Sequence, residues 1–222
     1  MKKIIIGIIF IISLIVTLLL TNVQISTFDR KFFQDKFEEY NISEVTKMEE
    51  NTLMEVTDEM LKYLKGDRKD LIIEAKIDGR QELVFGEREI LHMVDVRNLF
   101  KKGFMIRNIS LILVIVTLFL IVRFYIKDLY KILIIASIVP TLILFIFGIL
   151  LSINFNKYFD IFHEILFTND LWLLNPDTDI LIQMLPLDFF NSIAIKTLIY
   201  LILQLIIILF LGIILRKKYK IE

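Results

Sequence analysis

The sequence predicts a membrane protein that is mainly α-helical, with four transmembrane helices and an extracytoplasmic α+β cap of helices and a small hairpin. Two observations carry this prediction. Of the 222 residues, 56% are apolar, and the mean hydropathy of +0.69 lies far above that of a soluble domain. Four apolar runs also approach the roughly 20 helical residues that cross a bilayer core. We place these spans at residues 1–20, 108–126, 132–155 and 192–215.

The first span is expected to be an uncleaved anchor. Met1-Lys2-Lys3 looks like the basic start of a signal peptide, which is the alternative interpretation. The uncharged run Ile4 to Leu20 is longer than the apolar part of most signal peptides, however, and the following TNVQIST offers no A-x-A cleavage site. The second run is short by itself, but Arg123 can extend its side chain to the interface, so the span can continue to Ile126.

Basic residues set the predicted orientation, because short cytoplasmic loops are enriched in lysine and arginine. They gather before the first span, around a turn at 127–131 and in a tail at 216–222; the residues are Lys2, Lys3, Arg123, Lys127, Lys131, Arg216, Lys217, Lys218 and Lys220. With four spans, all three groups fall on one side. Both termini are therefore predicted to be cytoplasmic, and segments 21–107 and 156–191 extracytoplasmic.

The cap is predicted to contain helices and one hairpin. Phenylalanines at helical spacing favour a helix over 27–40, and Ser43 is the expected N-cap of a second helix that ends near Gly66. Asp78-Gly79 is a hairpin signal between strands at 71–77 and 81–85. A helix over 87–100 follows.

The second extracytoplasmic segment should turn and then form a short helix. Residues 168–174 must reverse the chain, and Trp172 there is suited to the membrane interface. Asn175 as N-cap and Pro176 in the first turn predict a helix from Asp177 to Leu185.

Several functional classes are disfavoured by composition. The chain has no cysteine, which removes thiol nucleophiles and thiolate metal sites, and its 26 basic and 26 acidic residues predict no nucleic-acid partner. We find no GxSxG, no phosphate-binding glycine loop and no nucleotide motif, and two histidines without tight ligand spacing do not favour a metal site. We therefore expect no cofactor and no metal.

The two histidines are the candidate functional residues. Glu89, His92 and Asp95 are spaced by three in the predicted helix, and Asp160 precedes His163 by three. A carboxylate one helical turn away can orient an imidazole. Both histidines lie at outer ends of adjacent antiparallel spans, so we expect them to meet at the boundary of cap and membrane. A catalytic pair and two interfacial polar residues both fit this pattern.

Two long motifs, EREILHMVDVRNLF and FHEILFTNDLWLLNPDTDILIQMLPLDFF, make the sequence resemble the bacterial lipoprotein intramolecular transacylase family of four-span membrane proteins. The resemblance covers essentially the whole chain, although the anchor and early cap match only in type. It implies a plasma-membrane acyltransferase acting on a diacylated lipoprotein, with membrane lipid around it and no obligate protein partner. The sn-2 acyl chain moves to the free α-amino group of the N-terminal cysteine, and a lyso-form lipoprotein results. It further implies that His92 and His163 are the catalytic pair.

The residues suit that chemistry. One imidazole can deprotonate the amine while the other protonates the leaving oxygen. Attack of the amine on the ester carbonyl closes a ring of about eight atoms, and a shaped pocket would orient the substrate for this step. Phe159, Phe162, Phe167 and Trp172 are candidate walls, and Asn169 or backbone N–H groups of 168–171 are candidate oxyanion donors. The assignment of acid and base stays open, as does a covalent acyl-histidine. The alternatives are a phospholipid acyl donor and a non-enzymatic binding or sensor protein.

Overall fold

The computed structural model describes residues 1–220, which divide into two compact units. The helical unit contains residues 1–25, 103–154 and 194–220, and the mixed unit contains residues 26–102 and 155–193. The expected tail at 216–222 falls within the last helix as far as residue 220, and its final two residues lie outside the described part.

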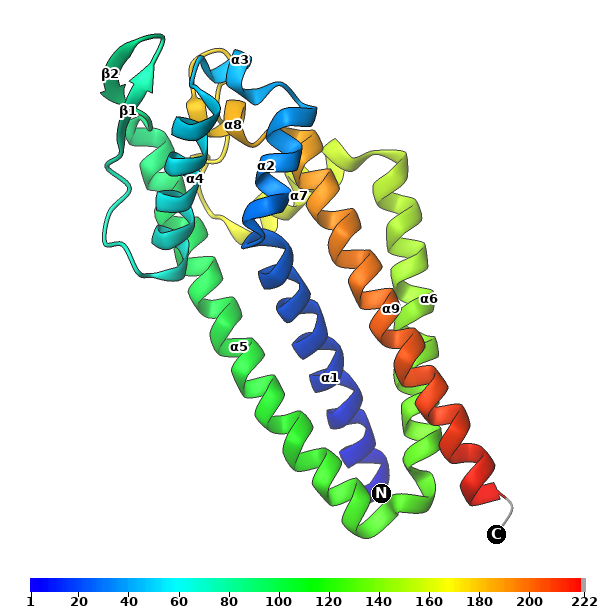
Figure 1. Ribbon diagram of the computed structural model, residues 1–222. Coiled ribbons are helices and arrows are strands. Elements are labelled where there is room, and N and C mark those ends of the chain that lie inside the picture. The colour runs from blue at the N-terminus through cyan, green and yellow to red at the C-terminus, as the bar shows by residue number, and fades with distance from the viewer. Residues whose placement is uncertain (221–222) are drawn as a thin grey trace. The chain divides into compact units, whose positions relative to one another are not determined.

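The helical unit is built from segments of four helices (Figure 1): α1 (Lys2–Thr27), α5 (Glu87–Tyr125), α6 (Leu129–Ile153) and α9 (Leu187–Lys220). The short 3-10 turn η1 (Ile126–Asp128) reverses the chain between α5 and α6. Asp128 in this turn forms ion pairs with Lys3 at 2.9 Å and Lys131 at 3.1 Å. The turn therefore lies where charged residues interrupt the apolar sequence.

Among the described residues 1–220, three helical stretches are long and apolar enough to cross a membrane: Lys2–Thr27, Glu87–Ile153 and Leu187–Tyr219. The second contains both α5 and α6 with the reversal between them. Large apolar side chains on this unit point outward, with Phe119, Phe145 and Ile214 exposed to 65%, 66% and 62%. A bilayer accommodates such a surface and water does not, so the chain is a membrane protein.

Specific contacts hold the helical unit together. A Cβ atom at Gly212 would lie only 3.0 Å from the side chain of Ile134, so glycine permits the close approach of α9 to α6. Asn22 on α1 and Gln204 on α9 exchange two hydrogen bonds of 2.8 and 3.1 Å between their side-chain amides. Each buried amide thus meets a polar partner within the unit.

The mixed unit has short helices and one two-stranded sheet. Its elements are α2 (Arg30–Glu39), α3 (Ile42–Thr46), α4 (Glu50–Lys65), β1 (Glu74–Ile77), β2 (Arg80–Leu83), the start of α5, α7 (Phe155–Leu166), α8 (Ile180–Met184) and the start of α9. Phe189 lies in its core with 1% exposure. Its ring centroid is 4.8 Å from that of Phe33 and 5.6 Å from that of Phe32, so the start of α9 packs on α2.

The hairpin agrees with the predicted turn. Asp78 and Gly79 both have positive φ, 49° and 78°, as a two-residue hairpin turn of the favoured hand requires. Ile77 pairs with Arg80 and Glu74 with Leu83. The strands are shorter than the expected 71–77 and 81–85, although the Val84 N–H still bonds to the Ile73 carbonyl at 2.9 Å.

The predicted helix start at Ser43 is wrong. Ser43 lies inside the short helix α3 and donates its hydroxyl to the Met48 carbonyl, while α4 begins only at Glu50. The residues around Ser43, which resembled the N-cap of α4, instead form the separate short helix α3.

The helix expected over Asp177–Leu185 begins at Ile180, because Asn175 starts a turn instead. The Asn175 side chain accepts from the Asp177 N–H at 3.0 Å, and its carbonyl accepts from the Asp179 N–H at 2.8 Å. An asparagine that bonds its own backbone two residues on favours a turn over a helix.

We predict that Phe189→Ala destabilises the protein by about 3–5 kcal/mol, because it opens a cavity among the packed rings of the core. Phe119→Ala removes the same atoms from an exposed position in the helical unit and should cost far less. Thermal unfolding in detergent would compare the two variants. Equal losses would show that the Phe189 cluster is not a cohesive core.

Candidate active site

The two histidines lie side by side in the mixed unit. His92 comes from α5 and His163 from α7, and the two side chains are buried, with exposures of 8% and 7%. Their ring centroids are 6.1 Å apart and their planes differ by 35°. Residues 71 positions apart in sequence thus form one pair, as the sequence led us to expect.

Aromatic side chains enclose the pair. The Phe167 ring lies 5.4 Å from His92 and 5.6 Å from His163. Trp172 stacks on His163 at 4.8 Å with a 27° interplanar angle, and Phe159 lies edge-on at 4.4 Å. Phe162 contacts the same imidazole at 5.4 Å. All four expected wall residues therefore border His163, and Phe167 borders both rings.

Helix α7 brings His163 inward through its amphipathic pattern. Asn156, Asp160 and Glu164 recur at spacings of four and line one polar side. The apolar side is only partly covered, since Phe162 is 48% exposed and Ile165 75% exposed. The helix thus has a buried edge that carries His163, a polar side, and an apolar side open to the surroundings.

His163 is held in one tautomer. Its Nδ1 lies 2.7 Å from the Phe159 carbonyl oxygen, which can only accept, so Nδ1 carries the proton and Nε2 keeps a lone pair. Burial lowers the pKa of His163 below its ordinary value of 6.5, while the Phe159 hydrogen bond and the charge of Asp160 act in the opposite direction.

The surroundings of His92 are less polar than those of His163. Its Nδ1 is buried, and no hydrogen-bond partner for it lies within residues 1–220. Burial, followed by the proximity of His163, lowers the pKa of His92 to about 4, against an opposing effect of Asp95. Both imidazoles are therefore neutral at neutral pH.

Both carboxylate oxygens of Glu89 accept from backbone N–H groups, and its role in orienting His92 stays a prediction. Its Oε2 accepts from the Gly86 N–H at 2.6 Å and its Oε1 from the Leu181 N–H at 2.6 Å. The bond to Gly86 joins a glutamate at the third position of α5 to the N-cap residue of that helix. This capping pattern is the signal for the bond that is present in the sequence. Burial is the main influence on the pKa of Glu89 and raises it.

Within residues 1–220, neither Asp95 nor Asp160 forms a hydrogen bond with an imidazole. Asp95 accepts a hydrogen bond from Asn169 Nδ2 at 2.8 Å. Asp160 acts on His163 through its charge. These two carboxylates thus act on the loop around the pair and on its electrostatics, and their orienting role stays a prediction.

Arg88 is a residue that the sequence patterns did not single out. Its Nε donates to the Leu173 carbonyl at 3.2 Å, its guanidinium also donates to the Asp170 carbonyl, and it forms an ion pair with the Asp170 carboxylate at 3.3 Å. It therefore holds both ends of the turn that carries Trp172. Only its position beside Glu89 could have drawn attention to it.

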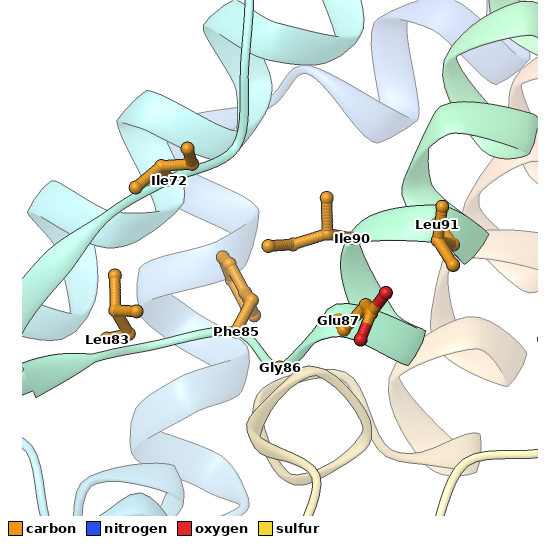
Figure 2. Close-up of a pocket in the computed structure, with 7 residues that line it drawn as sticks. All are labelled: Ile72, Leu83, Phe85, Gly86, Glu87, Ile90 and Leu91. Carbon is orange, nitrogen blue, oxygen red and sulfur yellow. The ribbon is translucent and has the colours of Figure 1, made fainter.

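A shallow apolar pocket of about 430 Å³ lies on the same unit, between the hairpin and the start of α5 (Figure 2). It is lined by Ile72, Leu83, Phe85, Gly86, Glu87, Ile90 and Leu91. Neither histidine borders it.

Known proteins resemble this chain in sequence and in fold. Residues 8–190 match the profile of the family described as lipoprotein intramolecular transacylase Lit. An uncharacterized protein of Aquifex aeolicus (strain VF5) is 28% identical over 216 residues, which cover 94% of this chain and 96% of that protein.

Solved structures of the membrane-integral lipoprotein intramolecular transacylase Lit from Bacillus cereus have the same fold. One has a TM-score of 0.85 at 21% identity and covers 100% of this chain and 99% of its own. A variant with a histidine replaced by alanine has a TM-score of 0.80 at 21% identity, covering 100% and 96%. A variant with arginine there has a TM-score of 0.79 at 22% identity, covering 99% and 94%. Because the family profile matches most of the chain, this membrane protein belongs to the lipoprotein intramolecular transacylase Lit family and is an acyltransferase.

Proposed function

We propose that the protein moves the sn-2 acyl chain of a diacylglyceryl-cysteine lipoprotein to the α-amino group of the same cysteine, with His92 and His163 as the acid/base pair. The observation that carries the proposal is a pair of buried, neutral imidazoles 6.1 Å apart in a chain of this family. The product is a lyso-form lipoprotein with one O-acyl and one N-acyl chain.

The atoms balance without a co-reactant. The neutral amine attacks the ester carbonyl carbon, and a C–N bond forms as the amine gives up a proton. The tetrahedral intermediate then collapses, the carbon–oxygen bond to the glyceryl group breaks, and the glyceryl oxygen takes one proton. The histidines carry this proton between the two sites, which is general acid/base catalysis worth roughly 10²–10⁴ in rate.

The hydrogen bond at His163 favours it as the base. With Nδ1–H donated to the Phe159 carbonyl, the Nε2 lone pair can accept the amine proton. The leaving oxygen takes its proton from the imidazolium that His163 has become, and His92, whose low pKa keeps its ring neutral, can donate a hydrogen bond from its N–H to that oxygen. Direct transfer within one substrate needs no acyl-histidine.

Attack of the amine on the sn-2 ester closes a ring of about eight atoms, which costs conformational entropy unless a pocket folds the headgroup. The rings of Phe159, Phe167 and Trp172 around the imidazoles form such an enclosure. For the oxyanion, the Leu171 N–H is already donated to Asn169 Oδ1. The second hydrogen of Asn169 Nδ2 is one side-chain donor that this turn offers.

We place the site at the membrane boundary of the extracytoplasmic side. The exposed apolar side chains Phe162, Ile165 and Leu166 on α7 support contact with lipid, and only Asn154 separates the end of α6 from the start of α7. Four spans at 1–20, 108–126, 132–155 and 192–215, with both termini cytoplasmic, remain our topology. It agrees with the reversal of the chain at η1.

We predict that His92→Ala and His163→Ala each lower the rate of N-acylation of a defined diacylated lipopeptide by at least about 100-fold. Purified protein would be supplied with the lipopeptide in detergent, with no other lipid ester present, and the product identified by mass spectrometry. Tyr158→Phe on α7 serves as a matched control for folding.

Each outcome of this assay separates one alternative. Full activity of both histidine variants would disprove acid/base catalysis by the pair. A requirement for added phospholipid would identify an intermolecular acyl donor instead. An acyl adduct on a histidine, found after rapid quenching, would establish a covalent intermediate.

The only tryptophan allows the charge of His163 to be followed directly. A protonated imidazole stacked on an indole quenches its fluorescence, so emission of Trp172 should fall as the pH is lowered. Because burial lowers the pKa of His163, the midpoint should lie below 6.5. His163→Gln should remove the transition and His92→Gln should keep it; a midpoint above 6.5 would contradict the assigned environment.

Arg88→Gln should lower kcat about tenfold or more, because the turn that carries Trp172 loses its hold on two carbonyls and one carboxylate. The same variant should shift Trp172 emission and move its pH midpoint toward 6.5. Arg97→Gln removes an arginine from the same helix away from this turn and should leave both spectral properties unchanged. An unaltered Trp172 spectrum in Arg88→Gln would rule out the positioning role.

A further inference from the structure

We propose that Asp95 binds the substrate through its α-ammonium group, as a carboxylate site for a primary ammonium ion beside the histidine pair. The inference rests on the proposed function and names the group that recognises the reacting amine. It also gives Asp95 a role different from the orientation of His92 that its sequence spacing suggested.

Asp95 lies beside the histidine pair, to which the amine must be delivered. It follows His92 by three residues on α5, so the two side chains are neighbours on one helix face, with Cβ atoms about 5–6 Å apart. The charge of Asp95 acts on the His92 imidazole. An ammonium group on this carboxylate would therefore lie within one helical turn of the imidazole pair.

The carboxylate is held in place but has no cationic partner. Asn169 Nδ2 donates to Asp95 Oδ2 at 2.8 Å, and the Leu171 N–H fixes the other end of that amide at 3.1 Å. Within residues 1–220, no lysine or arginine forms an ion pair with Asp95. The side chain is only half-buried, so Asp95 stays open to a ligand.

Other carboxylates near the site are less suited to this role. Glu89 gives both oxygens to backbone N–H groups, and Asp170 is paired with Arg88. Asp160 belongs to the polar side of α7 with Asn156 and Glu164. Asp95 is the carboxylate that combines proximity to His92 with a fixed position and an uncompensated charge.

The chemistry of the reaction fits an anchor at this position. A free α-amino group has a pKa of about 7.7–8.0 and is largely protonated at neutral pH. A charge-assisted bond to Asp95 would hold it beside the histidine pair, and the ammonium then releases one proton to solvent before the neutral amine attacks. The product nitrogen is an uncharged amide, so this attraction is lost on transfer. Asp95 would thereby favour substrate over product and assist product release.

The test measures binding of two unreactive lipopeptides to protein in nanodiscs. Both carry ether-linked chains in place of the esters, and they differ only in having an α-amino group or a hydrogen at the N-terminal residue. The wild-type protein should bind the amino ligand about tenfold more tightly, and Asp95→Asn should reduce that ratio toward one. Affinity for the desamino ligand should not change, which confirms that the variant is folded.

Glu164→Gln is the matched control, because it removes one acidic charge from the exposed side of α7 next to His163. It should keep the wild-type ratio. Equal weakening of both ligands by Asp95→Asn, or no preference for the amino ligand in the wild-type protein, would overturn the proposal. Since neither ligand reacts, the outcome is independent of catalysis: active histidine variants would disprove the proposed function while leaving the ammonium preference in place.

Discussion

The bond of the buried Glu89 carboxylate to two backbone N–H groups is the interaction on which the site depends. One N–H belongs to Gly86 at the start of α5 and the other to Leu181, which follows Glu89 by 92 residues. A carboxylate buried without such donors would be strongly destabilising. The next turn of α5 carries His92. The Glu89 carboxylate therefore begins this helix through Gly86 and also fixes the segment around Leu181 against it. Arg88 adds a further connection to that segment, at Asp170 and Leu173.

The enclosure formed in this way determines what the histidines can do. Phe167 and Trp172 remove water from the imidazoles, and desolvation disfavours the charged form. Neutral rings can accept and donate protons near neutral pH, whereas permanently charged rings could not act as bases. The Phe159 carbonyl adds direction by fixing the tautomer of His163. Aromatic packing and one backbone hydrogen bond therefore prepare the acid/base chemistry that we propose.

Local structures were predicted correctly where one short-range interaction decides the conformation. Asp78-Gly79 tolerates positive φ and forms the hairpin, and Gly66 ends α4 at the expected position. The failures arise where two local structures compete. Ser43 suits an N-cap but lies within α3, and Asn175 suits a helix start but forms a turn. The bonds of Glu89 to Leu181 and of Arg88 to Asp170 and Leu173 could not be predicted, because backbone groups of a distant segment leave no pattern in side-chain spacing.

The sequence by itself determined the membrane class, the helical stretches, the hairpin, and the two histidines as the residues to examine. Apolar run length and turn chemistry act locally, so they can be read along the chain. Only the tertiary structure decided that the imidazoles lie 6.1 Å apart, that Glu89 bonds to backbone, and that Asp95 pairs with Asn169. These contacts join segments more than 70 residues apart, and their geometry follows from packing in three dimensions, which residue spacing does not encode.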